Sequence, residues 1–161
     1  MQRLYMALFD FRDNSLLEIY PKRDELWVNG ARLRGLHTTD RVVMLFLAVA
    51  ALKWPGRSFR AKEVREEIGL KSVLIPDVNW PNQLEDGDIH TAVHNLRTAL
   101  SAERLNIGMI ESMSDRRIRL SIPVCNILIL GNDGNPILIP GVEPLILPSN
   151  QTKPKHIKST T

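Results

Sequence analysis

The stretch Asp88-Ile-His-Thr-Ala-Val-His-Asn-Leu-Arg-Thr-Ala-Leu100 decides the fold that we expect for this chain. Apolar residues recur in it every three or four positions, which is the spacing of one face of an α-helix. Asp88 stands at its start, where a carboxylate accepts hydrogen bonds from free backbone N–H groups and meets the positive end of the helix dipole. The apolar face consists of Ile89, Ala92, Val93, Leu96, Ala99 and Leu100. The stretch therefore predicts a helix over 88–100 that lies with one side against a core.

The opposite face of this helix is polar and carries no carboxylate. It consists of Thr91, His94, Asn95, Thr98 and Ser101, with His90 and Arg97 on its flanks. Such a face suits the major groove of B-DNA, where base edges offer hydrogen-bond donors and acceptors. Asn95 can pair with an adenine edge, and Arg97 with guanine or a phosphate. Thr91, His94 and Thr98 can contact bases or phosphates. Two alternatives remain open: a face that is only solvated, and an ion pair of Arg97 with Asp88 or Glu103.

Two further helices are predicted upstream. The first, over 38–53, begins with N-cap candidates and is apolar on nearly all sides, as a central core helix is. Pro55-Gly56 ends it. The second covers 61–68, with Gly69 as its expected C-terminal stop. The segment 70–87 is rich in Pro, Asn, Asp and Gly, so we expect a long loop there.

The first third of the chain predicts short antiparallel strands. The segments 4–11 and 16–20 are rich in apolar residues and are separated by a turn-forming cluster. The segments 26–28 and 31–33 flank Asn29-Gly30, which is the strongest short signal for a β-hairpin. We therefore expect three or four strands before the first helix.

Two more hairpins are predicted downstream of the helix 88–100. Segments 107–110 and 118–122 flank the turn-forming cluster Ser114-Asp115-Arg116-Arg117. Segments 128–130 and 137–139 flank a second cluster rich in Asn, Asp and Gly. The resulting order of elements is strands, helix, helix, loop, helix and hairpin.

This order resembles the OmpR/PhoB-type winged helix-turn-helix, the DNA-binding effector domain of many bacterial response regulators, over about residues 24–122. Leu36-His-Thr-Thr-Asp40 loosely matches the Leu-Thr-x-x-Glu start of the family's first helix. Arg60-Ala-Lys-Glu-Val64 stands where the family often has Ser-Arg-x-x-Leu. Val93-His-Asn-Leu-Arg-Thr-Ala-Leu100 is similar to its Ile-x-x-Leu-Arg-x-x-Leu signature. Ile110 to Leu120 fits the family's wing pattern without a gap, although Asp115, Arg117 and Ile118 replace its glycines and tyrosine.

The resemblance implies an α+β winged helix-turn-helix fold with a short N-terminal antiparallel sheet, three helices and a C-terminal β-hairpin wing. It implies a transcriptional regulator that binds double-stranded DNA sequence-specifically, with the helix 88–100 in the major groove. Contacts to phosphates or the minor groove are expected from Arg116, Arg117 and Arg119 in the hairpin, and from Arg60 and Lys62 at the start of the second helix. In this family the loop equivalent to 70–87 contacts RNA polymerase, so a protein partner is expected there.

Composition and charge divide the chain into three parts. With 161 residues, 43% of them hydrophobic, it has the length and composition of one soluble domain, which we place at 1–122. Segment 123–148 is expected to be a strand-forming extension, and its part 126–147 a homodimer contact, because an exposed apolar edge invites pairing. The tail 149–161 contains three lysines and no acid, which accounts for the net charge of +3. We expect this tail to be disordered.

The neutral body of the chain favours an alternative function. A winged-helix domain can serve as a protein-interaction module without DNA binding. The replaced glycines and the apolar C-terminal strands also favour this alternative. Glu111 and Asp115 are the carboxylates most able to interrupt a basic face, so their contacts discriminate between the two functions.

Other classes of function lack a signal. The single cysteine excludes an internal disulfide, and His90 and His94, one turn apart, have no third metal ligand nearby. We find no glycine-rich phosphate loop, Gly-x-Ser-x-Gly or His-Glu-x-x-His motif, so neither catalysis nor a cofactor is expected. Without a signal peptide or an apolar run of membrane-spanning length, the protein is expected to be cytoplasmic and not bound to a membrane.

Overall fold

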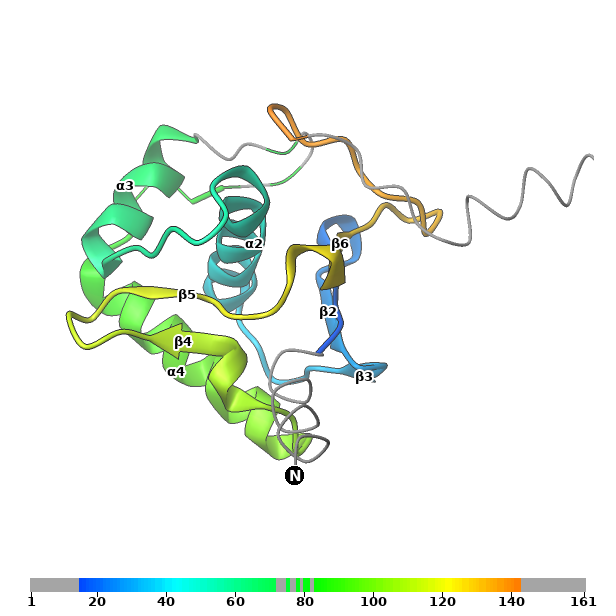
Figure 1. The fold of residues 1–161 in the computed structure, drawn as a ribbon, viewed down its shortest axis with the longest axis horizontal. Helices are drawn as coiled ribbons and strands as arrows, with labels where there is room; N and C mark the ends of the chain where they lie inside the picture. The colour runs from blue at the N-terminus through cyan, green and yellow to red at the C-terminus, as the bar shows by residue number, and fades with distance from the viewer. Residues whose placement is uncertain (1–14, 72–74, 76–77, 79, 82, 143–161) are drawn as a thin grey trace, which may run out of the picture.

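The computed structural model of the chain describes residues 15–71, 75, 78, 80–81 and 83–142. Within them the fold is α+β, with a four-stranded sheet, three helices and a separate two-stranded hairpin (Figure 1). The expected strand 4–11 and the tail 149–161 lie outside the described residues. No helix in the described ranges has the length and apolar character needed to cross a bilayer.

Three strands of the sheet form the predicted antiparallel meander: β1 (Leu17–Tyr20), β2 (Glu25–Val28) and β3 (Ala31–Arg32). Asn29 and Gly30 join β2 to β3 with φ values of 52° and 82°. A tight turn with two successive positive φ angles has the same twist as the strands that it joins. Asn and Gly are the residues that tolerate positive φ angles best. The predicted hairpin is therefore confirmed.

The fourth strand, β6 (Ile127–Ile129), pairs with β1 in parallel, so the sheet order is β3-β2-β1-β6. The folded unit consequently continues past the boundary expected at residue 122. The second predicted C-terminal hairpin is reduced to a tight turn and one bridge between Leu130 and Pro136. Residues 137–139 form no strand, although the Ile137 N–H donates to the Ile129 carbonyl oxygen at 2.9 Å.

The three helices are α2 (Thr38–Lys53), α3 (Ala61–Leu70) and α4 (Asp86–Ala102). Two predicted ends are corrected. Gly69 lies inside α3, which ends at Leu70 and is followed by Lys71 as its C-cap, with φ 59°. Asp88 is the third residue of α4 and not its first. Its Oδ2 accepts a hydrogen bond at 2.8 Å from the backbone N–H of Glu85, the residue that precedes the helix, as in a capping box.

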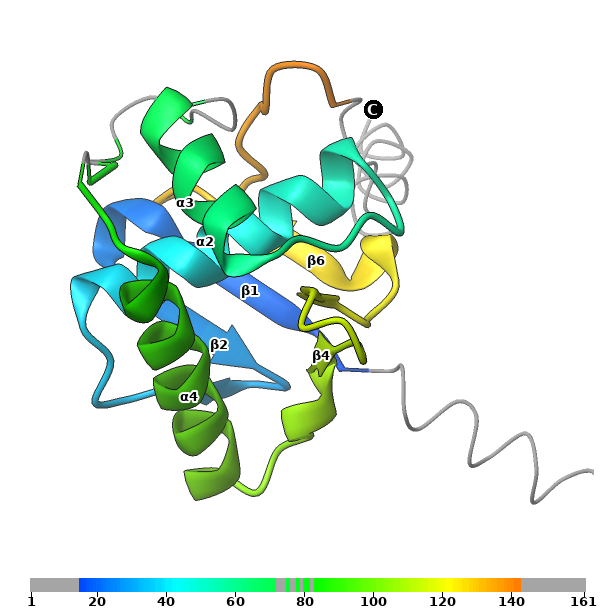
Figure 2. The ribbon, with the colours of Figure 1, turned by 90° about the vertical axis from the view of Figure 1, so that its left-hand side faces the viewer.

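Helix α2 lies in the middle of the molecule, with the sheet on one side and α3 and α4 on the other (Figures 1 and 2). Its central residues are buried on all sides, as the sequence predicts. The six apolar residues predicted for the inner face of α4 are all buried. Phe46 of α2 packs edge-on against Phe59, with ring centroids 5.2 Å apart. One core therefore holds the sheet and the helices together.

The predicted hairpin after α4 is also present, with strands β4 (Ile110–Ser112) and β5 (Ile118–Leu120). Residues 107–109 form a 3-10 turn and not a strand. Strand β5 also contacts the connection between α2 and α3. The Phe59 N–H donates to the Ile118 carbonyl at 2.9 Å, and the Ile118 N–H donates to the Phe59 carbonyl at 2.8 Å. The hairpin is thus fixed beside the start of α3.

Candidate nucleic-acid interface

The outer face of α4 presents three of the predicted contact residues to solvent. Thr91, His94 and Thr98 are exposed and follow one another along the helix, one turn apart. None of the three side chains has a hydrogen-bond partner among the described residues. This face is open to solvent.

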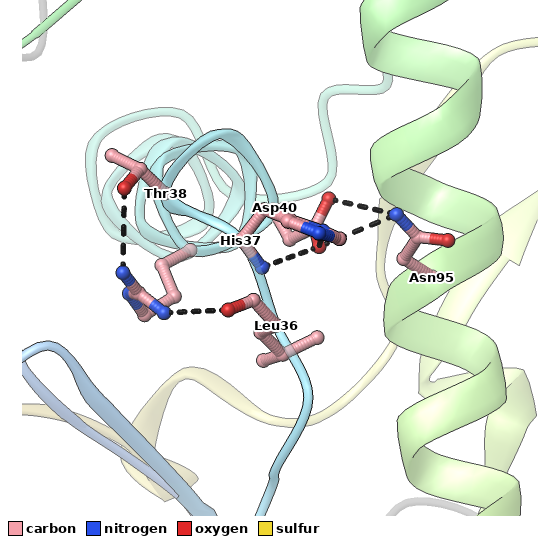
Figure 3. A network of polar contacts seen from close by, with 6 residues as sticks. Leu36, His37, Thr38, Asp40 and Asn95 are labelled. Carbon is pink, nitrogen blue, oxygen red and sulfur yellow. Dashed lines mark hydrogen bonds and ion pairs between the residues drawn. The ribbon is translucent and has the colours of Figure 1, made fainter.

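Asn95 is not part of that open face. Its Nδ2 donates to both carboxylate oxygens of Asp40 in the first turn of α2, at 3.3 Å each (Figure 3). Asp40 is 2% exposed and also accepts a hydrogen bond from the His37 backbone N–H at 2.8 Å. Buried carboxylates need such partners. Asn95 therefore holds α4 against α2.

Arg97 is also engaged within the fold. Its Nη2 donates to the Ile110 carbonyl oxygen at 2.7 Å and to the Ser112 Oγ at 2.6 Å, and both acceptors belong to β4. The ion pair with Asp88 or Glu103, left open by the sequence, is therefore replaced by contacts with the hairpin. Arg97 links α4 to β4.

The three hairpin arginines have different surroundings. Arg117 Nε lies 2.9 Å from Asp115 Oδ2, and Arg117 Nη1 lies 3.3 Å from Glu63 Oε1 in α3. Arg119 Nε lies 2.9 Å from Glu111 Oε1. The side chain of Arg116, in the turn, is exposed and has no partner among the described residues. The carboxylates singled out by the sequence therefore compensate two of the three charges.

In the turn of the hairpin, the pKa of the Asp115 carboxyl is shifted from its ordinary value. Burial acts to raise the pKa of the Asp115 carboxyl, but hydrogen bonds from the Arg117 backbone N–H and side chain outweigh it. The net pKa of Asp115 is lower than its ordinary value. Asp115 therefore remains ionised at neutral pH and binds Arg117 as a charged partner.

A basic cluster forms where the hairpin meets the start of α3. Arg60 and Lys62 are exposed there. The Arg57 guanidinium, also exposed, lies over the rings of Trp54 and Phe59, 5.1 and 4.5 Å from their centroids. We call the following residues the basic cluster: Arg57, Arg60, Lys62, Arg116, Arg117 and Arg119. The segments 57–63 and 110–120 that carry it contain six basic side chains and three carboxylates, so cations predominate.

The start of α4 has the opposite charge. Glu85, Asp86 and Asp88 are exposed there. Arg65 of α3 donates from Nε to Asp86 Oδ1 at 2.8 Å, and this hydrogen bond raises the pKa of the Arg65 guanidinium. Carboxylates at a helix start stabilise the helix through its dipole. This end of α4 is consequently less suited to an anionic ligand than its middle.

The loop predicted over 70–87 is shorter in the structure, because α3 and α4 extend into it from both sides. Of its described residues, Ile75 and Trp80 are buried against the core, and the Trp80 Nε1 has no hydrogen-bond partner within the described part of the chain. Several other loop residues lie outside the described ranges.

The C-terminal extension contributes mainly to the core of its own chain. Ile127, Ile129 and Ile139 are buried in it. Leu138 and Val124 stay exposed, at 72% and 40%, beside an apolar groove of about 460 Å³. Strand β6 is the edge strand of the sheet, and residues 143–147 of the expected dimer segment lie outside the described residues.

In the described ranges, no group of three or more His, Cys, Asp or Glu side chains could hold a metal ion. His90 and His94 are both exposed on α4. Comparison of the chain with protein-family models, with curated proteins and with solved structures finds no match.

Proposed function

We propose that this chain is a winged helix-turn-helix domain that binds double-stranded DNA. In this proposal α4 enters the major groove, and the basic cluster contacts the phosphates beside it. The observation that carries the proposal is the pair of hydrogen bonds between Phe59 and Ile118. Through them the basic residues of two distant segments form one cluster.

The order and contacts of the elements support the winged-helix assignment. Helices α3 and α4 pack together across α2, and the β4–β5 hairpin follows α4 directly. The hairpin pairs with the connection between α2 and α3, so it lies beside the helix pair. In a winged helix-turn-helix the second helix of the pair is the recognition helix, and here that helix is α4.

The distribution of charge supports phosphate contacts at the cluster. Lys62 and Arg116 have no described partner, and Arg60 is exposed. Basic side chains in such positions displace counterions from the DNA backbone, which supplies most of non-specific affinity. The B-DNA major groove, about 12 Å wide, admits one helix, and the middle of α4 offers it a face without acids.

The proposal is tested by fluorescence anisotropy with a labelled duplex over a series of salt concentrations. The variant Arg60→Ala/Arg116→Ala removes two charges from the cluster. The control Arg34→Ala/Arg104→Ala removes two exposed arginines elsewhere, and Arg104 matches Arg116 in its positive φ, 58° against 69°. We expect the cluster variant to bind more weakly and to reduce the slope of log K against log salt by about 2, roughly one per lost phosphate contact. Equal effects of both variants, or no binding at low salt, would contradict the proposal.

A protein-interaction module with the same fold is the second candidate. It is favoured by the ion pairs of Arg117 with Asp115 and of Arg119 with Glu111, which reduce the charge of the hairpin. This candidate predicts no duplex binding at low salt, so the same experiment separates the two.

Among the described residues of the segment 126–147 from which we expect a homodimer, Leu138 is a large hydrophobic residue that is 72% exposed, and we propose it as a dimer contact. Cutting the chain after Ile122 would remove β6 and disturb the sheet, so a point variant is the better test. We expect Leu138→Glu to shift a dimer toward the monomer in size-exclusion chromatography. Leu70→Glu changes a leucine of similar exposure, 75%, and serves as the control. A monomeric wild-type chain would contradict the dimer.

A further inference from the structure

We infer that the protein binds double-stranded DNA with little preference for base sequence, an inference that rests on the DNA binding proposed above. Strong direct discrimination between base pairs comes from side chains that make two hydrogen bonds to one base edge. These are Asn or Gln on adenine, and Arg or Lys on guanine; Asp or Glu can also accept from cytosine. The structure engages every such side chain of α4 within the fold.

The amide of Asn95 is the first of them. Pairing with adenine uses the donor and the acceptor of one amide together. The Nδ2 of Asn95 instead contacts both oxygens of Asp40, at 3.3 Å each (Figure 3). Turning the amide toward DNA would remove this donor from a carboxylate that is 2% exposed. Asn95 therefore stays with α2 when α4 meets a groove.

The guanidinium of Arg97 is the second. Its Nη2 already donates to the Ile110 carbonyl and to Ser112 Oγ, at 2.7 and 2.6 Å. Reaching guanine would break both contacts and detach α4 from the hairpin that carries half of the basic cluster. Arg97 thus holds α4 against the β4–β5 hairpin and does not contact a base.

The carboxylates of α4 are engaged as well. Asp86 pairs with Arg65 at 2.8 Å, and Asp88 accepts the Glu85 N–H at 2.8 Å. What remains on the open face is Thr91, His94 and Thr98. A hydroxyl both donates and accepts, so it accommodates several base edges, and one imidazole makes a single contact. The basic cluster contacts phosphates, which carry no sequence information directly.

The inference is tested with the full chain and a pool of random duplexes of one length. Bound DNA is recovered over several rounds and sequenced, and individual recovered duplexes are then measured by anisotropy against scrambled controls. Sequence-specific proteins prefer their site by about a thousandfold or more over other DNA. We expect differences below about tenfold here, and no enriched motif.

A triple variant, Thr91→Ala/His94→Ala/Thr98→Ala, sharpens the test. We expect it to change the affinity for all duplexes by the same factor, because the open face has no preferred base. An enriched motif bound about a hundredfold more tightly than its scrambled form would overturn the inference and leave DNA binding intact. Failure to bind any duplex at low salt would overturn both the inference and the proposed function.

Discussion

The inner flank of α4 and the basic cluster use the same kinds of side chain for different purposes. On the flank, Asn95 and Arg97 contact groups of their own fold, the nearly buried Asp40 and the backbone of β4. In the cluster, Arg117 and Arg119 pair with exposed or half-exposed carboxylates, and Arg116 has no described partner. The comparison shows that the fold uses those polar groups of α4 that face a neighbouring element. The polar side chains of α4 that stay open to solvent are those that face no such element.

Asp40 offers the strongest way to break this comparison. Replacing Asp40 with Ala removes the acceptor of the His37 N–H and of the Asn95 amide. We expect the free energy of unfolding to fall by about 2–3 kcal/mol, because donors at a buried site lose their partner. Urea denaturation followed by circular dichroism measures it. The control Asp40→Asn keeps one acceptor oxygen and should lose less; an equal loss in both variants would contradict the role given to the carboxylate.

Arg97 provides a second and smaller test. Arg97→Ala leaves the Ile110 carbonyl without its side-chain donor, and Ile110 is 1% exposed. We expect a loss of about 1–2 kcal/mol in the free energy of unfolding. The control Ser112→Ala removes only the exposed acceptor and should cost less. An equal loss in both variants would contradict the role given to the contact with the Ile110 carbonyl.

Local signals in the sequence predicted most of the described elements. The inner face of α4 was predictable because its apolar residues recur with the helical period of 3.6 residues. The β2–β3 turn was predictable because Asn29 and Gly30 favour its positive φ angles by themselves. The parallel pairing of β6 with β1 was not predicted. It depends on a connection that spans nearly the whole described chain, and the sequence gives no local sign of it.

The same distinction between local and distant signals explains the candidate site. The pattern of apolar and polar residues in α4 identifies the polar side of the helix. It does not identify which residues of other elements contact Asn95 and Arg97 at the edges of that side. Asp40 was recognised only as a helix-start residue, and its contact with Asn95 joins two helices far apart in the chain. Glu63 was not considered as a partner of Arg117 for the same reason. Exposure of Thr91, His94 and Thr98 was predictable because it requires only the helical period.

The smallest effect is expected in the cluster itself, at the titration of Asp115. Hydrogen bonds from Arg117 keep the pKa of Asp115 below its ordinary value despite the opposing effect of burial. A carboxyl whose pKa is lower in the folded state stabilises the fold above its unfolded pKa, and this contribution is lost as the pH falls through the folded value. We therefore expect the ion pair with Arg117 to persist at neutral pH and to disappear only in acid, below the ordinary aspartate range.

NMR titration of the carboxyl carbons in the wild type and in Arg117→Ala tests this prediction. The pKa of Asp115 should rise toward its ordinary value in the variant, because its hydrogen-bonding cation is gone. The carboxyl of Asp133 is the matched control: hydrogen bonds from Asn135 lower its pKa, and Arg117 has no part in them. An Asp115 pKa that is unchanged in the variant would mean that Arg117 does not pair with Asp115 in solution. The contact of Arg117 with Glu63 would remain, but the charge of the basic cluster would be less compensated. The duplex affinity of the wild type should then depend more steeply on salt.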